Sequence, residues 1–297
     1  MTNFSKMRNQ MKQGAGFIAA LDQSGGSTPK ALGLYGVDAS DYSDEAAMFA
    51  EMQKMRARIM SAPGFTSSKV IGTTLFEKTL KEEIDGQSVP EFLWKQRGIV
   101  PFLKIDKGLQ DEAEDVQLLK DIPSLGATLA EAKALGVYGT KARSVINGAN
   151  ANGIAKIVAN QFEIGHEVIA AGMVPILEPE INIHSTTKAE AETLLAGALM
   201  ARVQSLGEGQ DIMLKLTLPE VPGIYDALAD HPRVVRVVAL SGGYSTTDAS
   251  TRLAQNHKII ASFSRALTQG LQRDMTDAEF QAALGANIDL IHSASVA

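Results

Sequence analysis

Two cations stand two residues apart in an otherwise apolar segment of this 297-residue chain. They are Lys141 and Arg143, in the sequence GVYGTKARSVI (136–146). Because alternate side chains of a strand point to the same side, both would project from one face of an apolar wall. A charge in such a place is costly unless it is paired, so the two cations need a negative or reactive group to face.

Other polar residues stand within or just after further apolar segments. Burying a single charge in an apolar strand is costly unless an opposite charge lies next to it. Cations and carboxylates from different strands would therefore neutralise one another in a shared site. The residues are Asp22, Lys104, Asp106, Glu178, Glu180, Lys215 and Ser241, the last followed by Gly242 and Gly243.

This combination suits a nucleophilic amine. A lysine becomes nucleophilic near neutral pH when its ammonium form is disfavoured by burial or by a second cation, and Lys141 beside Lys215 would supply that cation. Glu178 or Asp22 could then move protons during carbinolamine and imine steps. The glycines after Ser241 would let backbone N–H groups approach a phosphate.

Each of these residues, taken alone, also has an ordinary structural interpretation. Lys104 and Lys215 could extend their ammonium groups to solvent. Glu178 and Glu180 could belong to a solvated loop, and Asp22 could begin a simple turn. Only their combination at strand ends favours a site.

The elements that would position these residues alternate between strands and helices. Apolar periodicity predicts helices around 48–59 and 154–169, and capping boxes predict helix starts at Thr187 with Glu190 and at Thr276 with Glu279. The stretches 23–43 and 77–97 read as loops. Eight apolar segments predict strands: 16–22, 69–76, 98–106, 136–146, 173–181, 211–218, 233–243 and 257–264.

This alternation predicts an α/β fold, a single (β/α)8 TIM barrel over residues 1–297, since no linker divides the chain. An open doubly wound sheet is the structural alternative, but the Gly-rich turns lack the spacing of a dinucleotide-binding fingerprint. In a barrel, chemistry takes place at the carboxyl ends of the strands, where the polar residues above lie.

Composition excludes several classes of function. A net charge of -6 and the lack of long Lys/Arg runs argue against nucleic acid. No segment approaches the roughly 18 consecutive apolar residues of a membrane span, and no signal peptide is evident, so we expect a cytoplasmic protein. The sequence contains no cysteine, which excludes disulfides, thiolate metal sites and a cysteine nucleophile.

Seven ordered motifs resemble those of the class I fructose-1,6-bisphosphate aldolases. They are LDQSGGS, KIDKG, TKARS, VPILEPEI, LKLTLPE, LSGG and FSRAL, which together extend from about residue 16 to residue 270. The resemblance implies a (β/α)8 barrel and metal-independent, reversible cleavage of the ketose bisphosphate to dihydroxyacetone phosphate and glyceraldehyde 3-phosphate. It implies no cofactor and no metal ligand.

The resemblance also implies roles for individual residues. Lys215 matches the Schiff-base lysine, Glu178 the principal acid/base and Glu180 a supporting acid. Asp22 resembles the aspartate that orients the lysine and the C4 hydroxyl, and Lys141 the lysine that stabilises charge there. The expected substrate contacts are Lys104 and Arg143, then Ser241, Gly242 and Arg265 at the C1 phosphate, and Ser24 and Ser27 near the C6 phosphate.

The chain departs from the animal members of this family at several places. No tyrosine follows Tyr244, so Glu178 or Glu180 would have to move the proton at C3 in place of a terminal tyrosine. Gln23 stands where those members have glutamate, Ala142 where they have tryptophan, and Ala31 where an arginine assists the C6 phosphate. Lys30 would substitute for that arginine.

Three other functions remain to be weighed. A zinc-dependent aldolase needs histidine ligands, but the five histidines are scattered without metal-ligand spacing. Another Schiff-base barrel, such as a transaldolase, would share the lysine. A non-catalytic sugar-phosphate binder would share only the fold. A homo-oligomer is possible, since helix faces that join subunits cannot be separated here from those that cover the barrel.

Overall fold

The computed structural model describes residues 2–297, and its centre is a parallel sheet rolled into a barrel. The strands neighbour one another in the order β1-β2-β5-β7-β8-β9-β10-β11, so their order in the sheet follows their order along the sequence. Every predicted strand is confirmed. The bounds are β1 (Phe17–Leu21), β2 (Val70–Leu75), β5 (Val100–Lys104), β7 (Gly139–Ile146), β8 (Val174–Ile181), β9 (Ile212–Thr217), β10 (Val234–Leu240) and β11 (Ile259–Ala261).

The two ends of the sheet meet, so the predicted barrel is confirmed and the open doubly wound sheet is wrong. Just after β11, the carbonyl of Phe263 accepts a hydrogen bond from the N–H of Ala20 in β1 at 3.2 Å. Short additions lie outside the barrel. β6 (Val116–Gln117) pairs antiparallel with the end of β7, and β3 (Glu83–Ile84) forms a hairpin with β4 (Gln87–Ser88).

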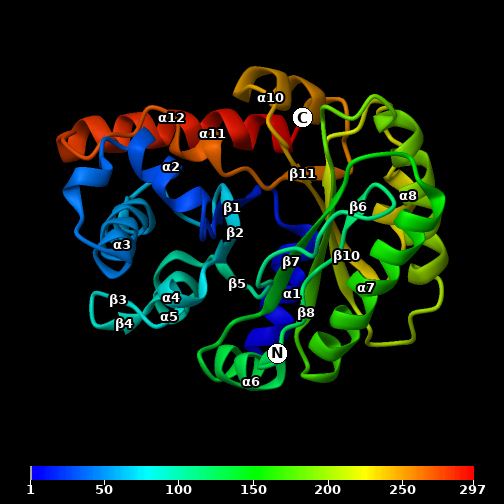
Figure 1. The fold of residues 1–297 in the computed structure, drawn as a ribbon. Coiled ribbons are helices and arrows are strands. Elements are labelled where there is room, and N and C mark those ends of the chain that lie inside the picture. The colour runs from blue at the N-terminus through cyan, green and yellow to red at the C-terminus, as the bar shows by residue number, and fades with distance from the viewer. Residues whose placement is uncertain (1) are drawn as a thin grey trace.

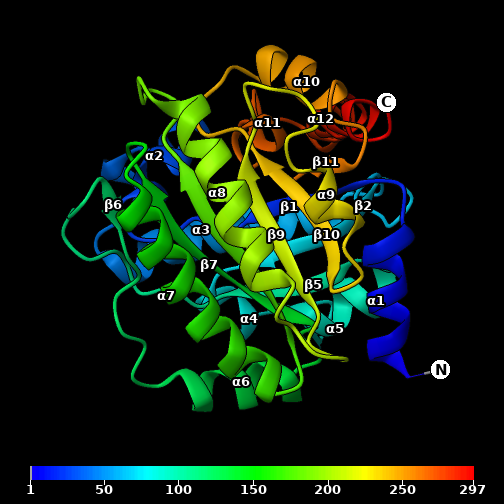
Figure 2. The ribbon, with the colours of Figure 1, turned by 90° about the vertical axis from the view of Figure 1, so that its right-hand side faces the viewer.

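Helices surround the strands and cover the outer face of the barrel. Figure 2 shows α7 and α8 in front of strands β7 to β9. Away from these two helices, α12 lies close to α11 and β11 (Figure 1). Their bounds are α1 (Asn3–Gln13), α2 (Ser27–Leu34), α3 (Glu45–Ser61), α4 (Glu77–Leu80), α5 (Val89–Phe92), α6 (Leu125–Ala134), α7 (Ala151–Ala170), α8 (Lys188–Val203), α9 (Asp226–Asp230), α10 (Thr246–Ala254), α11 (Arg265–Thr268) and α12 (Asp277–Ser295), with η1 (Ala39–Asp41) and η2 (Leu93–Arg97).

The apolar periodicity explains the two long helices that were predicted. In α7, Ile157 and Phe162 are buried against the strands, and in α3 Met52 and Ile59 are fully buried. Both faces of the sheet are therefore covered, which is why its strands are apolar along their length rather than alternating.

The amino-terminal end of the barrel is closed by α1. Met7 and Met11 belong to the same apolar cluster as Ile18 and Phe102, which point into the barrel. The side-chain amide of Gln10 donates to two carbonyls at this end, those of Ile71 and Gly98, at 2.8 and 2.6 Å. Because this end is plugged, only the carboxyl end of the barrel is left open for a site.

Two sequence predictions need correction. The stretches 23–43 and 77–97 are not simple loops but contain α2, η1, α4, α5, η2 and the β3–β4 hairpin. These elements are too short to show a helical period. The Thr276 capping box is confirmed. A helix also begins after Thr187, as predicted, but the capping box there is wrong: Thr187 lacks the extended backbone of an N-cap, and its hydroxyl accepts from the N–H of Ala149 at 3.0 Å. Within residues 2–297, no helix has the length and apolar character needed to cross a membrane.

Candidate active site

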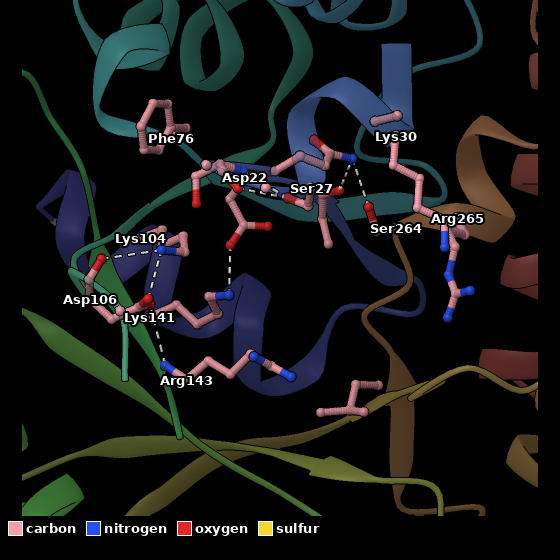
Figure 3. Close-up of a pocket in the computed structure, with 18 of the residues that line it drawn as sticks. Asp22, Ser27, Lys30, Phe76, Lys104, Asp106, Lys141, Arg143, Ser264 and Arg265 are labelled. Atoms are coloured by element: carbon pink, nitrogen blue, oxygen red, sulfur yellow. Dashed lines mark hydrogen bonds and ion pairs between the residues drawn. The ribbon is translucent and has the colours of Figure 1, made fainter. Parts of the chain in front are cut away.

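A cavity of about 940 Å³ opens at the carboxyl ends of the strands (Figure 3). Apart from Glu178, all of the catalytic and substrate-binding residues expected from the sequence line it. The lining includes Asp22, Ser24, Ser27, Lys104, Lys141, Arg143, Glu180, Lys215, Ser241, Gly242 and Arg265. Residues far apart in the chain are thus brought to one rim, as the strand-end pattern predicted.

Two lysines and two carboxylates form a buried cluster at the base of the cavity. Lys141 Nζ lies 2.7 Å from Asp22 Oδ2 and 2.9 Å from Glu178 Oε2, and Lys215 Nζ lies 3.0 Å from Glu178 Oε1. Asp22 follows β1 and the others come from β7, β8 and β9. Figure 3 shows Lys141 extended toward Asp22. The formal charges of the four groups sum to zero, so their mutual attraction offsets the free-energy cost of burying them.

The electrostatics of this cluster favour the ionised forms of Asp22, Glu178 and Lys141. Burial by itself would raise the pKa of Asp22 and of Glu178, but the ammonium groups of Lys141 and Lys215 outweigh it and hold both values below the ordinary range. Burial would lower the pKa of Lys141, and the carboxylates of Asp22 and Glu178 raise it instead. The expected influence of Lys141 on the nucleophilicity of Lys215 stays a prediction.

Sequence reasoning missed two residues that support Asp22. Thr74, fully buried in β2, donates its hydroxyl to Asp22 Oδ1 at 2.9 Å. Arg56, only 1% exposed on α3, donates to the carbonyl of Gln23 at 2.6 Å and to the hydroxyl of Thr79 at 2.8 Å. A threonine in a strand gives no signal, but an arginine inside the apolar period of α3 could have been noticed.

A second set of ion pairs lies nearer the mouth of the cavity. Lys104 Nζ is 2.6 Å from Asp106 Oδ1, so two of the polar residues singled out in the sequence pair with each other. The other carboxylate oxygen of Asp106 accepts from the backbone N–H of Arg143 at 3.3 Å. The Arg143 guanidinium is paired with Glu180. These groups border the cavity and keep cationic donors available to an anionic ligand.

The turn after β10 and the start of α11 form one end of the cavity. Gly242 and Gly243 have φ values of 60° and 130°, which favour glycine, and a Cβ at Gly242 would lie 2.6 Å from Ile183 Cγ2. Arg265 opens α11 and lines the cavity. Figure 3 shows Lys30 and Arg265 at the same end of the cavity. Backbone N–H groups and a guanidinium at one place suit a phosphate.

The two predicted serines lie at the start of α2. Ser27 Oγ donates to the carbonyl of Ser24 at 2.9 Å and accepts from the N–H of Ser24 at 3.0 Å.

Within residues 2–297, no group of three or more histidine, cysteine or acidic side chains is arranged to hold a metal ion, and neither histidine nor tyrosine is among the residues lining this cavity. The donor set therefore does not match that of a zinc aldolase.

Comparison with known proteins identifies the family. The family model described as fructose-bisphosphate aldolase class-I matches residues 4–224. The fructose-bisphosphate aldolase class 1 of Synechocystis sp. is 51% identical over 287 residues, covering 97% of this chain and 96% of that protein. The protein of the same name from Porphyromonas gingivalis is 50% identical and covers 97% of both chains.

A solved structure with the same fold supports the architecture. The fructose-bisphosphate aldolase of Plasmodium falciparum, crystallised with TRAP and a small-molecule inhibitor, superimposes with a TM-score of 0.79 at 20% identity, covering 99% of this chain and 94% of that one. At this identity, the likeness concerns the fold alone. The family match and the two bacterial relatives extend over most of the sequence, and the chain belongs to the class I fructose-bisphosphate aldolase family.

Proposed function

We propose that the chain cleaves fructose 1,6-bisphosphate reversibly to dihydroxyacetone phosphate and glyceraldehyde 3-phosphate through a Schiff base on Lys215. The observation that carries this proposal is the position of Lys215. Lys215 is 4% exposed at the base of the cavity, and its Nζ lies 3.0 Å from a carboxylate, Glu178, that also contacts Lys141. A carbonyl placed there would meet a nucleophile and a proton carrier together.

The first step is attack of the neutral Lys215 amine on the C2 ketone. Glu178 first takes the proton that the Lys215 ammonium gives up to become the neutral amine, and a second proton passes from the attacking amine to the C2 oxygen. Both protons end on that oxygen, which leaves as water, so that a protonated imine forms. The imine carries the same positive charge as the original ammonium. The cluster with Asp22, Lys141 and Glu178 therefore stays balanced throughout, which avoids an unpaired buried charge.

The second step breaks the C3–C4 bond. The protonated imine withdraws the bonding electrons as the Glu178 carboxylate takes up the proton of the C4 hydroxyl, and glyceraldehyde 3-phosphate departs. Asp22 would orient this hydroxyl, and its carboxylate is fixed for that role by contacts with Thr74 and Lys141. Lys141 lies next to it and would stabilise developing charge on the C4 oxygen.

The remaining enamine must be protonated at C3 before hydrolysis releases dihydroxyacetone phosphate. We assign this proton to Glu178 rather than Glu180. Glu178 contacts Lys215, whereas Glu180 is held by Arg143. This assignment gives one carboxylate the proton transfers on both sides of the imine.

Two phosphate grips position the substrate. Ser241, Gly242 and Arg265 would hold the C1 phosphate. The opposite phosphate would contact Lys104, Ser24 and Ser27, with Arg143 nearby. Lys30 lies at the Arg265 end of the cavity and is not assigned to this second phosphate (Figure 3). Binding energy from both ends keeps the scissile bond aligned with Lys215. We further propose that residues 1–297 act as one domain, since the site draws on strands from β1 to β10. We also propose that the protein is cytoplasmic.

The experiment is a coupled assay of fructose 1,6-bisphosphate cleavage with and without a chelator. We expect turnover that is unchanged by the chelator, and faster than turnover of fructose 1-phosphate because one grip is then empty. Activity abolished by the chelator would contradict the lysine mechanism. Binding of the sugar bisphosphate without any cleavage would favour a non-catalytic binder instead.

A further inference from the structure

A polar network that begins at a buried ion pair and continues to the exposed carboxylate of Glu220 lies outside the cavity and takes no part in the chemistry above. Lys188 and Glu192, one turn apart on α8, are 4% and 0% exposed and pair with each other. Lys188 Nζ also donates to the carbonyl of Leu218 at 2.8 Å and lies 3.1 Å from Glu220 Oε1. Apolar side chains of similar volume often stabilise a core at least as well as a buried ion pair does, so we looked for another role for this network.

The network holds the segment that follows the strand carrying Lys215. Glu192 Oε2 accepts from the backbone N–H of Glu220 at 2.9 Å, while Lys188 holds the carbonyl of Leu218. Two backbone groups just beyond β9 are thereby fixed to α8. The Glu220 carboxylate is held by Lys188 at the same time, which sets the direction in which it points.

From Glu220 the network reaches the turn after the next strand. Glu220 Oε1 accepts from the hydroxyl of Tyr244 at 3.0 Å, and Oε2 accepts from Arg252 at 3.2 Å. The Arg252 guanidinium lies 4.4 Å from the centre of the Tyr244 ring. Burial and the bond to Glu220 raise the pKa of Tyr244 to about 12, so its hydroxyl remains a donor at neutral pH.

Tyr244 closes the turn that lines the cavity. Its backbone N–H donates to the carbonyl of Ser241 at 3.0 Å, across Gly242 and Gly243. Two successive glycines make this turn costly to order, because each loses much backbone freedom when it is fixed. The side chain of Tyr244 therefore provides an anchor directly after the two flexible residues.

We infer that Glu220 and Tyr244 are positioning residues that hold the Ser241–Gly243 turn ready for a substrate phosphate, in register with Lys215. This inference rests on the proposed function, because it assigns the turn to phosphate binding. If the turn is ordered in advance, the phosphate does not supply the ordering energy when it binds. Removal of the anchor should therefore weaken phosphate binding and leave the chemical step intact.

The test compares Tyr244→Phe, Glu220→Gln and the double variant with the wild type. The matched control is Tyr138→Phe, whose buried hydroxyl has no hydrogen-bond partner among residues 2–297 and lies in the cluster with α1 at the other end of the barrel. For Tyr244→Phe we expect KM for fructose 1,6-bisphosphate to rise roughly fivefold with kcat within about twofold. The dissociation constant of inorganic phosphate, measured by calorimetry, should rise by a similar factor.

Several outcomes would overturn the inference. One is a Tyr244→Phe variant of normal Tm whose KM and phosphate affinity match those of the control. Another is a fall in kcat at constant KM. Because both substitutions alter the hydrogen bond between Tyr244 and Glu220, the effect of the double variant should be smaller than the sum of the two single effects, and full additivity would contradict the inference. Calorimetry needs no turnover, so a wild type that binds phosphate without cleaving sugar would refute only the proposed function.

Discussion

Glu178→Gln removes the carboxylate that contacts both Lys141 and Lys215. In the wild type, Glu178 Oε2 is 2.9 Å from Lys141 and Oε1 is 3.0 Å from Lys215. Glutamine keeps the size of the side chain but leaves two ammonium groups beside Asp22 alone. The buried cluster then carries one uncompensated positive charge. Both stability and catalysis should suffer, for separate reasons.

The size of each loss follows from this geometry. At an effective dielectric constant of 20, one contact of about 3 Å between unit charges corresponds to about 5 kcal/mol, much of it offset by the cost of burying the carboxylate. Breaking a buried pair costs about 3–5 kcal/mol. With an unfolding entropy of about 2.1 cal/mol/K per residue, that loss lowers Tm by about 5–8 °C. Loss of the proton carrier should lower kcat by about 10²–10⁴.

The measurements are calorimetric unfolding and steady-state cleavage at pH 7. Glu190→Gln is the matched control, because Glu190 is an exposed carboxylate on α8. The control should match the wild type in both experiments. A Glu178→Gln enzyme with a kcat within about twofold of the wild type would refute the assignment of proton transfer to Glu178. An unchanged Tm would refute the electrostatic account of the cluster.

Three further predictions concern neighbouring groups. Lys215→Met should abolish cleavage and keep the fold, since methionine fills the space of the lysine stem; substantial residual activity would contradict the nucleophile. Arg265→Ala should raise KM by roughly 10- to 100-fold with a smaller change in kcat, and an unchanged KM would place Arg265 outside the phosphate site. The lowered pKa of Asp22 contributes stability that is present above its ordinary value of about 3.9 and is lost as pH falls through the folded value. Urea unfolding between pH 6 and pH 2 should therefore show a steeper loss for the wild type than for Asp22→Asn.

The barrel strands could be predicted because each is a continuous apolar run between polar or glycine-rich stretches. The long helices α3 and α7 could be predicted from their apolar period. By contrast, four-residue elements such as α4 and α5 depend on tertiary packing, since isolated helices of that length are not stable. The Thr187 capping box was predicted wrongly because the Thr187 hydroxyl accepts instead from the backbone N–H of Ala149, a residue distant in the sequence.

The candidate site was predictable where a charge interrupted an apolar strand. Lys141, Glu178 and Lys215 stand out in this way, and the barrel brings them to one rim. The pairing of Glu178 with both lysines could not be predicted, because it depends on the register between strands. Thr74 gave no signal at all, since a threonine is common in any strand.

The central claim is that Lys215 forms the Schiff base. Borohydride reduction in the presence of dihydroxyacetone phosphate, followed by peptide mass mapping, tests it most directly, because reduction makes the transient imine permanent. The wild type should gain one adduct on the peptide that contains Lys215, and the Lys215→Met variant should gain none. An adduct on Lys104 or Lys141 instead, or no adduct while the enzyme turns over, would contradict the proposed mechanism.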